Sequence, residues 1–492
     1  ANENVIPSTI EQIALNRIGV TTDNVRRALE AAAVAGRQFS LAVLELVLDG
    51  DEIVQQAREV LVSRNIWQEL HGETYQFRHA LIHEAIYNSI LRARRQTIHL
   101  EVARALEKNL AGRRFEHSEL LAHQYLEAKA PKNALIYFAA AGRRALHIYA
   151  IDDAFHNLNE AEKIVAVSPR EIDQDIIYDV TLDLSQTLYY RGQIGALASF
   201  LVSRTELFIS LNAKSSLPRL MFYKGLAETL SAESKSAQES LLLCSNIAEE
   251  LQSPLETGYG KLGLALFQTF WVPPTPDQDE QTTRLCDEAI EAARLHDDLW
   301  LHAMALNTLA RNALLHGDPK RLNLYANLLL ALAEATGDPL PRQFALLRLS
   351  SLAANGGDPD DAIAKADTAK SLAISPLDHL MADASKGVAL TSANRGPEAY
   401  DVLMPLHQHA IANQHSELRA IIDLSLGASM VIKGELSKGV RWIEATRRTF
   451  VSWNYVTGIA LSHLVLGEGN LRLLDGRIKP PLIIILKNLG FL

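Results

Sequence analysis

The sequence predicts a mostly α-helical protein in which a small winged-helix domain precedes an α-solenoid of two-helix repeats. Three observations predict this fold class. Aromatic residues make up only 6% of the 492 residues while Ala and Leu are abundant, and small or straight-chain apolar side chains favour closely packed helices. Apolar and polar residues alternate within residues 66–77, as they do in strands. Further along, helix-breaking turns recur about every 20 residues.

Bulk composition limits the classes of function. The net charge is −10 and is spread along the chain, so no general nucleic-acid surface is expected, because such a surface needs a basic face. No run reaches the ~20 apolar residues that span a bilayer, and no membrane contact is expected. The two cysteines, Cys244 and Cys286, lack metal-ligand spacing. This usage is typical of a reducing compartment, and we expect a cytoplasmic protein.

Helical periodicity begins near the first residue. Residues 7–18 predict a helix, with apolar residues at helical spacing. Thr22 predicts the start of a second helix and Gly36 its end. Two more short helices are expected over residues 39–48 and 51–64.

Strand-like alternation follows these helices. Residues 66–70 and 75–77 alternate around a turn-like segment and predict a β-hairpin. Three short helices followed by a two-stranded wing indicate a winged-helix domain over residues 21–77. Its third helix carries three acidic residues against two arginines, and this balance would repel DNA phosphates. We therefore expect protein contacts here, and nucleic-acid binding is disfavoured.

From residue 78 onward the pattern is helical. We assign residues 78–130 to a helical hinge or linker and residues 131–492 to tetratricopeptide-like (TPR-like) repeats. Small residues recur where two antiparallel helices of one repeat must approach closely. Helices are expected over residues 94–108, 117–128, 132–148 and 152–165.

The tripeptide Gly-Asp-Pro provides the clearest periodicity, with starts at Gly317, Gly337 and Gly357. Gly accepts the left-handed conformation after a helix, Asp caps the next helix and Pro fits its first turn. A helix with its turn takes ~20 residues and a pair ~40, which is longer than the ~34 of a standard tetratricopeptide repeat. The proline-rich stretch 271–281 is predicted to be a loop. Further turns are expected at Gly192, residues 231–236, Pro376, Pro397, Asn413, Gly434 and Gly476.

Both ends of the chain are interpreted as cuts. The chain starts at Ala1 with polar, helix-like sequence and ends at Leu492, shortly after the apolar run 482–486. We therefore expect a segment of a larger protein.

The sequence contains no complete catalytic or metal-binding motif. A phosphate-cradling GxxxxGK[ST] loop, a GxSxG elbow and a CxxC pair are all absent, so no catalytic residue is predicted. His79 and His83 are four residues apart, but Ala80 stands where a zinc-protease motif has Glu and no third ligand is placed, so no metal site is predicted. The basic residues Arg92, Arg94 and Arg95 are interpreted most simply as a solvated helix face, with a binding patch as the alternative.

A resemblance to a known superfamily covers residues 5–165. The stretch FRHALIHEAIYNSILRARRQTIHLEVARALE, together with AAAVAGRQFS, resembles the region that follows the nucleotide-binding domain in bacterial STAND-type signalling ATPases. That superfamily includes large LuxR-type transcriptional regulators and multidomain class III adenylate/guanylate cyclases. The ending IKPPLIIILKNLGF is similar to segments of cyclase-linked tails. The resemblance implies that residues 1–20 end a preceding ATPase module.

The same resemblance implies a nucleotide contact. In these ATPases the winged helix closes over bound ADP, and a histidine of a phenylalanine-x-histidine motif reaches the phosphate. The matching residue here is His79. A histidine at a helix start can donate to a phosphate oxygen, and Arg78 beside it favours the anion. The simpler alternative is that His79 only caps or packs within its helix.

Three functions follow as hypotheses. The first is a regulatory and sensor segment, in which the repeats bind a protein partner or small inducer and control the nucleotide state of the implied ATPase module. The output would be cyclic-nucleotide synthesis or transcription. No cofactor is expected in this segment itself, and ATP or ADP is expected in the parent protein. The second is a stand-alone scaffold for protein partners, and the third is a DNA-binding regulator.

Overall fold

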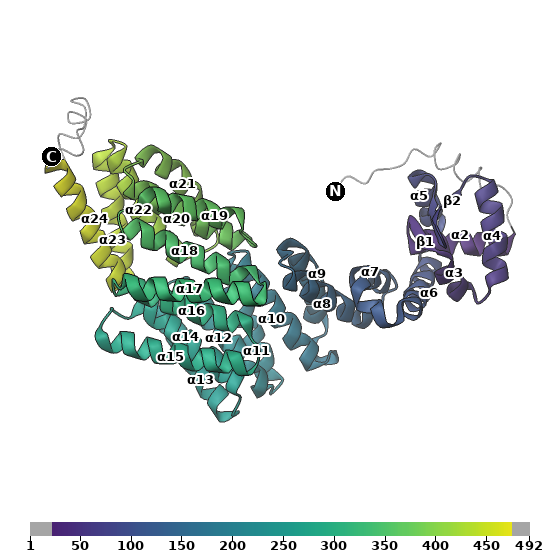
Figure 1. Ribbon diagram of the computed structural model, residues 1–492. Coiled ribbons are helices and arrows are strands. Elements are labelled where there is room, and N and C mark those ends of the chain that lie inside the picture. Colours follow the sequence, from purple (N-terminus) through teal and green to yellow (C-terminus); the bar gives the residue numbers. More distant parts are fainter. Residues whose placement is uncertain (1–21, 475–492) are drawn as a thin grey trace. The chain divides into compact units, whose positions relative to one another are not determined.

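The computed structural model describes residues 22–474, which belong to two compact units, Ala1–Asp183 and Leu184–Leu492 (Figure 1). Helices make up most of the described residues of both units, and the strands of the described part form one small sheet. The mostly α-helical class with helical repeats is therefore confirmed. The helix expected over residues 7–18, the assignment of residues 1–20 and the turn at Gly476 lie outside the described residues.

The first unit begins with short helices around a three-stranded antiparallel sheet of order β1-β3-β2. The hairpin predicted over residues 66–77 is confirmed as β2 and β3. The helix predicted from residue 39 was wrong at its start, because Phe39 pairs with Tyr75 and so belongs to a strand. The elements are α2 (Asp23–Ala35), β1 (Gln38–Ser40), α3 (Leu41–Leu48), α4 (Asp51–Ser63), β2 (Trp67–His71) and β3 (Thr74–Phe77).

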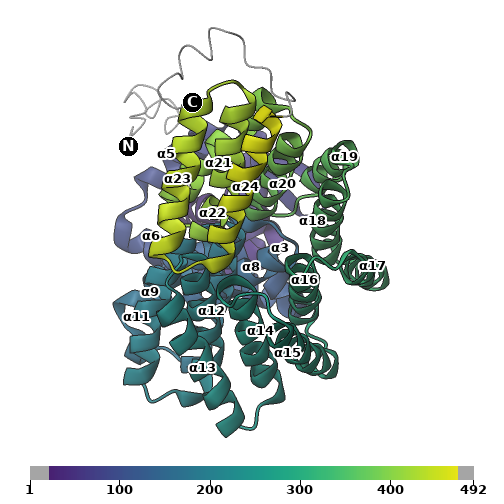
Figure 2. The same cartoon turned by 90° about the vertical axis from the view of Figure 1, so that its left-hand side faces the viewer.

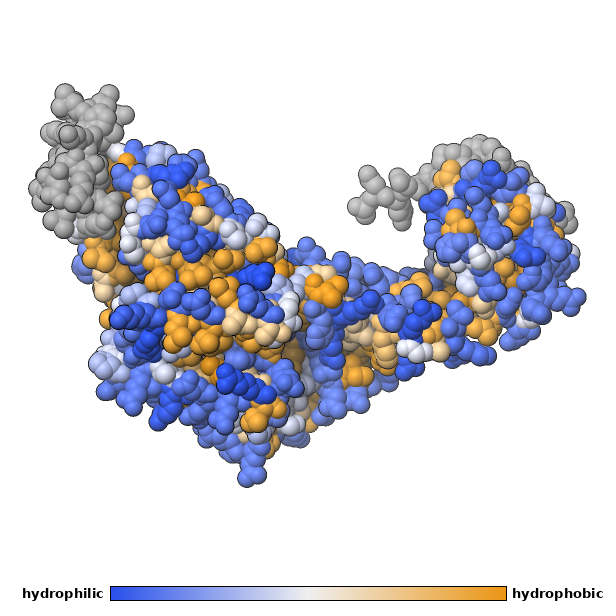
Figure 3. Space-filling model, viewed as in Figure 1, coloured by the Kyte–Doolittle hydropathy of each residue, from blue (hydrophilic) through white to orange (hydrophobic). Residues whose placement is uncertain are grey.

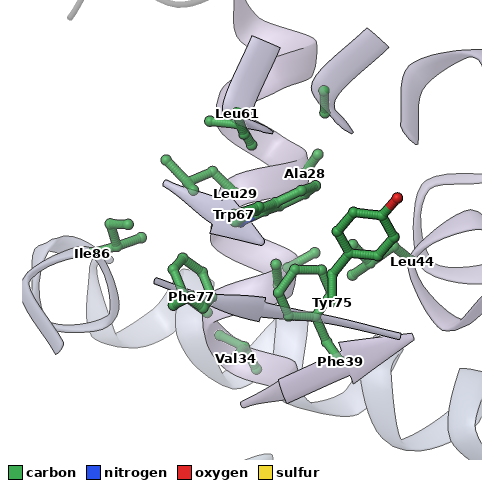
Figure 4. Close-up of a cluster of buried hydrophobic side chains, with 14 of the residues drawn as sticks. Ala28, Leu29, Val34, Phe39, Leu44, Leu61, Trp67, Tyr75, Phe77 and Ile86 are labelled. Atoms are coloured by element: carbon green, nitrogen blue, oxygen red, sulfur yellow. The ribbon is translucent and has the colours of Figure 1, made fainter. Parts of the chain in front are cut away.

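Aromatic side chains of the sheet form the centre of this part of the unit (Figure 4). The ring of Phe39 lies 4.8 Å from that of Trp67 and 5.6 Å from that of Phe77, measured between centroids. All three are buried against apolar residues of α2 and α4 such as Leu29 and Leu61. Burial of large aromatic rings dominates the stability of small cores, so Phe39 explains why residues 38–40 join the sheet.

Helices continue through the rest of the first unit. Thr22 caps α2, as predicted, by accepting a hydrogen bond from the Val25 amide at 3.4 Å. The helices expected over residues 94–108, 117–128, 132–148 and 152–165 are all present. The elements are α5 (Ala80–Ser89), α6 (Arg92–Leu110), η1 (Ala111–His117), α7 (Ser118–Glu127), α8 (Pro131–His147), α9 (Ile151–Val167) and η2 (Pro169–Glu171).

The described part of the second unit is entirely helical. Helix α10 (Gln174–Tyr190) reaches into it from the first unit. The remaining elements are α11 (Ile194–Ser210), η3 (Lys214–Ser216), α12 (Leu217–Leu230), α13 (Ser234–Glu250), α14 (Pro254–Trp271), α15 (Pro276–Leu295), α16 (Leu299–Leu315), α17 (Pro319–Thr336), α18 (Pro339–Asn355), α19 (Pro359–Ser371), α20 (Pro376–Ser392), α21 (Gly396–Ala412), α22 (Ser416–Ile432), α23 (Leu436–Ser452) and α24 (Val456–Leu474).

The turn chemistry of Gly-Asp-Pro is confirmed at all three sites. Gly337 ends α17 in the left-handed conformation, with φ of 74°. Asp318 accepts hydrogen bonds from the amides of Lys320 (3.1 Å) and Arg321 (3.0 Å), and Asp338 and Asp358 cap α18 and α19 in the same way. A proline opens each following helix. Sequence alone therefore placed these helix boundaries correctly.

The loop predicted over residues 271–281 was wrong in extent. Only residues 272–275 separate α14 from α15. Thr275 caps α15 by accepting from the Gln278 amide at 3.2 Å, Pro276 occupies the first turn, and Asp277 and Asp279 lie where the helix dipole favours acidic residues. The prolines and acids that suggested a loop are helix-start residues.

Even-numbered helices form the inner layer of the second unit, and odd-numbered helices pack outside them. Each inner helix from α12 to α24 contacts the next inner helix. In Figure 2 this layer curves from α12 through α14, α16, α18 and α20 to α22, which lies back against α12. The repeats of this unit therefore form a superhelix that closes on itself.

Candidate functional site

A hollow of about 90 Å³ lies among the inner helices of the second unit. The side chains that line it come from six alternate helices, α10 to α20, and from the turn before α22, and they are mostly buried and apolar. Representative lining residues are Tyr190 of α10, Leu230 of α12, Phe270 of α14, Met304 of α16, Leu347 of α18, Leu377 of α20 and His415 before α22. The residues that line the hollow are therefore spread over nearly half of the sequence.

A few polar groups interrupt this apolar wall. The Arg348 guanidinium donates to Oδ1 of Asn307 at 2.8 Å, and the Arg311 guanidinium lies 3.7 Å from the centroid of the Phe270 ring. Asp378 is buried, and burial raises the pKa of its carboxyl, which accepts from the Ser375 hydroxyl at 2.7 Å. An apolar hollow with few, fixed polar groups has the make-up of a ligand site.

The outer side of the same unit carries an open apolar groove between α15, α16 and α17. Its volume is about 530 Å³. Its apolar lining includes Ile290, Leu306, Leu309, Tyr325 and Leu328, and the charged residues Asp287, Glu291 and Arg294 also line it. Figure 3 shows apolar side chains gathered over this region of the second unit. The groove gives a second surface on which the repeats could contact a partner.

The residues predicted to contact nucleotide, Arg78 and His79, lie together at the start of α5. Both side chains are exposed. Arg78 donates to Oδ1 of Asn65 at 2.7 Å, and His79 precedes the first helical residue without a side-chain capping bond. Two cationic or donor side chains therefore face solvent beside a helix N-terminus, a position that favours anions.

His83, four residues beyond His79, points to a backbone group. Its Nε2 lies 2.9 Å from the carbonyl oxygen of Ala33 in α2. Within residues 22–474 no group of three or more His, Cys, Asp or Glu side chains is placed to hold a metal ion. His83 thus joins α5 to α2.

A directed chain of hydrogen bonds links α5, α6, α7 and α2. Gln124 Nε2 donates to the Val34 carbonyl at 3.0 Å, so its Oε1 accepts from His99 Nδ1 at 2.8 Å. Burial lowers the pKa of His99, and the Nε2 of the neutral ring accepts from the Tyr87 hydroxyl at 3.0 Å. Sequence reasoning missed this chain because its members lie 12 to 90 residues apart.

The basic run after α5 differs from the solvated face predicted for it. Arg95 is half-buried, lies 4.6 Å from the centroid of the Tyr87 ring and donates to the Tyr87 carbonyl. Arg94 lies 3.8 Å from Glu30 and 4.0 Å from Glu101. Only Arg92 is exposed. Tertiary contacts with α2 and α5, which a helical pattern does not show, account for the difference.

Both cysteines are structural. Cys244 and Cys286 are 0% exposed, and burial raises the pKa of each thiol. A buried neutral thiol is a poor nucleophile. No helix of the described part is long and apolar enough to cross a membrane.

Comparison with known proteins gives limited matches. No family model matches the chain. An uncharacterized protein of Rhizobium meliloti is 30% identical over 166 residues, which are 33% of this chain and 15% of that protein. The chain thus spans a small fraction of the length of this relative.

Two solved structures match the chain at low identity. One is a STAND protein with a tetratricopeptide repeat sensor from Pyrococcus horikoshii, with a TM-score of 0.45 and 13% identity over 95% of this chain and 67% of that one. The other is a Rap protein in complex with competence and sporulation factor, with a TM-score of 0.43 and 10% identity over 70% of this chain and 99% of that one. Both scores lie below 0.5, so the helical-repeat fold rests on the structure described above.

Proposed function

We propose that this chain is the regulatory and sensor segment of a signalling ATPase. Its TPR-like repeats bind a protein partner or small inducer, and binding changes the nucleotide state of an ATPase module in the same protein. The hollow among the inner helices carries this proposal, because it combines a mostly apolar wall with a few fixed polar groups. The outer groove of α15 to α17 offers a larger surface for a protein partner.

The coupling element in this proposal is the segment from β3 to α6. Residues 21–77 would act as a winged helix that covers ADP bound to the ATPase module, with His79 donating to a phosphate and Arg78 adding positive charge. Both side chains are exposed at the start of α5. Behind them, His83 and the Tyr87–His99–Gln124 chain attach α5 to α2, α6 and α7. Through these hydrogen bonds, a movement of α7 would shift α5 and with it Arg78 and His79, which lie at its start.

The output domain follows only from the sequence resemblance, which favours a nucleotide cyclase over a LuxR-type regulator. A stand-alone protein-binding scaffold is the competing function, and the outer groove would serve it equally well. The coding sequence upstream of Ala1 separates the two. A P-loop there supports the sensor function, and a start codon at this position contradicts it.

Substitution of His79 in the full-length protein tests the nucleotide contact. His79→Ala should weaken ADP binding about 10- to 100-fold, because a hydrogen bond to a charged group contributes about 1.5–3 kcal/mol. Basal output should rise as ADP is lost. The measurement is the ADP dissociation constant, with His71→Ala, an exposed histidine of β2, as the control. Unchanged ADP affinity in His79→Ala would count against the role.

A further inference from the structure

The second unit closes on itself where α22 lies against α12 and where the start of α11 contacts the turn before α22. The backbone N–H of Gly195 donates to the carbonyl of Asn413 at 2.9 Å. Gly195 is the second residue of α11, where an N–H has no acceptor within its own helix. This hydrogen bond therefore exists only while the two ends of the superhelix meet.

The close fit at this contact depends on two glycines, Gly192 and Gly195, which have no side chain. A Cβ on Gly195 would lie 2.7 Å from Oε1 of Gln414. A Cβ on Gly192 would lie 3.3 Å from a methyl of Leu380 and 3.7 Å from a methyl of Leu377, which also lines the hollow. We call this contact of Gly192 and Gly195 with residues 377–414 the seam. Leu377 thus belongs both to the seam and to the wall of the hollow.

Two properties make the seam the place where the hollow can widen. A hollow of about 90 Å³ holds only a few waters or one side chain, whereas ligand pockets measure about 300–1,000 Å³. From α11 to α24, helices that follow one another in the chain pack against each other, and this stacking is what a solenoid needs. The seam joins elements far apart in the sequence by a backbone hydrogen bond and close approaches to two glycines.

We propose that parting of the seam admits a ligand to the hollow, so that the seam acts as a gate. This inference rests on the proposed function of the repeats as the binding region. Gln414 is exposed, so the seam is reached from solvent. A parted seam widens the hollow and gives an incoming ligand a path to it.

A disulfide across the seam tests the gate. In Gly195→Cys/Gln414→Cys the new Cβ of residue 195 lies 3.1 Å from the position of Gln414 Cγ, within reach of a disulfide. The native Cys244 and Cys286 are fully buried and do not compete. Stopped-flow binding of the fluorescent apolar anion 1-anilinonaphthalene-8-sulfonate is measured before and after reduction. Two variants show where the dye binds. Thr308→Trp fills the hollow and should abolish the fluorescence signal of dye bound there. Leu328→Lys changes the outer groove and should leave that signal unchanged.

The oxidised double variant should bind the dye at least ~10-fold more slowly than its reduced form, because the gate opens by local separation of packed elements. Equal rates in both forms overturn the gate. The single variants Gly195→Cys and Gln414→Cys serve as controls for the substitutions themselves.

Hydrogen exchange in the unmodified protein decides the same question without any substitution. If the seam parts by itself, the Gly195 amide should exchange at least ~10-fold faster than the Leu201 amide in the middle of α11. Exchange of Gly195 as slow as that of Leu201 overturns the gate. Fast exchange at Gly195 without any dye binding would support the gate and contradict the hollow as a ligand site, so the two failures are distinguishable.

Discussion

At the scale of single residues, the network around His99 shows how a buried polar group is tolerated. His99 is 4% exposed, and both of its ring nitrogens have partners. An unpaired buried polar group costs about 1–3 kcal/mol, so the partners Tyr87 and Gln124 are as necessary as the ring itself. The amide orientation of Gln124, set by the Val34 carbonyl, leaves His99 one acceptable tautomer.

This network predicts a pH dependence of stability. Burial holds the pKa of His99 below its ordinary 6.5, so the unfolded chain takes up a proton at a higher pH than the folded one. The contribution of His99 to the free energy of unfolding is therefore fully present above about pH 6.5 and is lost as the pH falls below that value. Urea unfolding at pH 7.5 and 5.5 checks this. His99→Asn should show a smaller loss between the two pH values, whereas the exposed control His71→Asn should behave like the parent.

The aspartates that cap helices predict a second effect of single residues, a loss of stability when the cap is removed. Asp318→Ala removes the acceptor of two amides at the start of α17 and should destabilise the second unit by about 0.5–2 kcal/mol. Thermal unfolding measures the shift. The exposed Glu334 near the other end of α17 provides the control, since Glu334→Ala should be near neutral. Equal effects of the two substitutions would contradict a capping role.

At the scale of elements, helix pairs approach closely where a glycine of one helix meets an apolar side chain of the next. A Cβ on the glycine would lie between 2.3 and 2.5 Å from that side chain in four pairs. In each pair the two residues are about 16 positions apart. The pairs are Gly142 with Leu158, Gly225 with Leu241, Gly387 with Leu403 and Gly427 with Ile443. This spacing was present in the sequence and would have marked the helix pairs.

Filling one of these contacts should destabilise its unit. Gly142→Ala places a Cβ 2.4 Å from Leu158, and overpacking costs about 1–3 kcal/mol, more than the ~1 kcal/mol at most that Ala gains over Gly in a helix. Thermal unfolding should therefore show a lower midpoint. Gly112→Ala, where a Cβ meets nothing within 4 Å, is the matched control. In a Leu158→Ala background the same Gly142→Ala substitution should lose its penalty, and a persistent penalty would refute the packing account.

Elements were predictable where local chemistry decides them. Asp318, Asp338 and Asp358 mark helix starts because the cap bonds a residue two or three positions away. Residues 38–40 became a strand through Tyr75 and Trp67, partners that no local window contains. Residues 276–281 carried helix-start residues that also suit loops, and only the packing of α15 against α14 and α16 decided between the two.

At the scale of the whole molecule, the division into Ala1–Asp183 and Leu184–Leu492 predicts unfolding in more than one step. Compact units with separate cores need not unfold together. Calorimetry should show two transitions. Gly142→Ala should lower only the transition of the first unit, and Asp318→Ala only that of the second. A single transition that shifts with both substitutions would contradict independent units.

The sequence by itself determined the helical class, the hairpin over residues 66–77 and the turns of the repeats, because periodicity and capping act over a few residues. It also singled out Arg78 and His79, whose exposed positions at the start of α5 are local features. Only the tertiary structure decided which helix faces turn inward, since this depends on the small rotation between successive repeats, added over many helices. The hollow, the seam at Gly195 and the His99 network also depend on the tertiary structure, because their members are neighbours in space and distant in the chain.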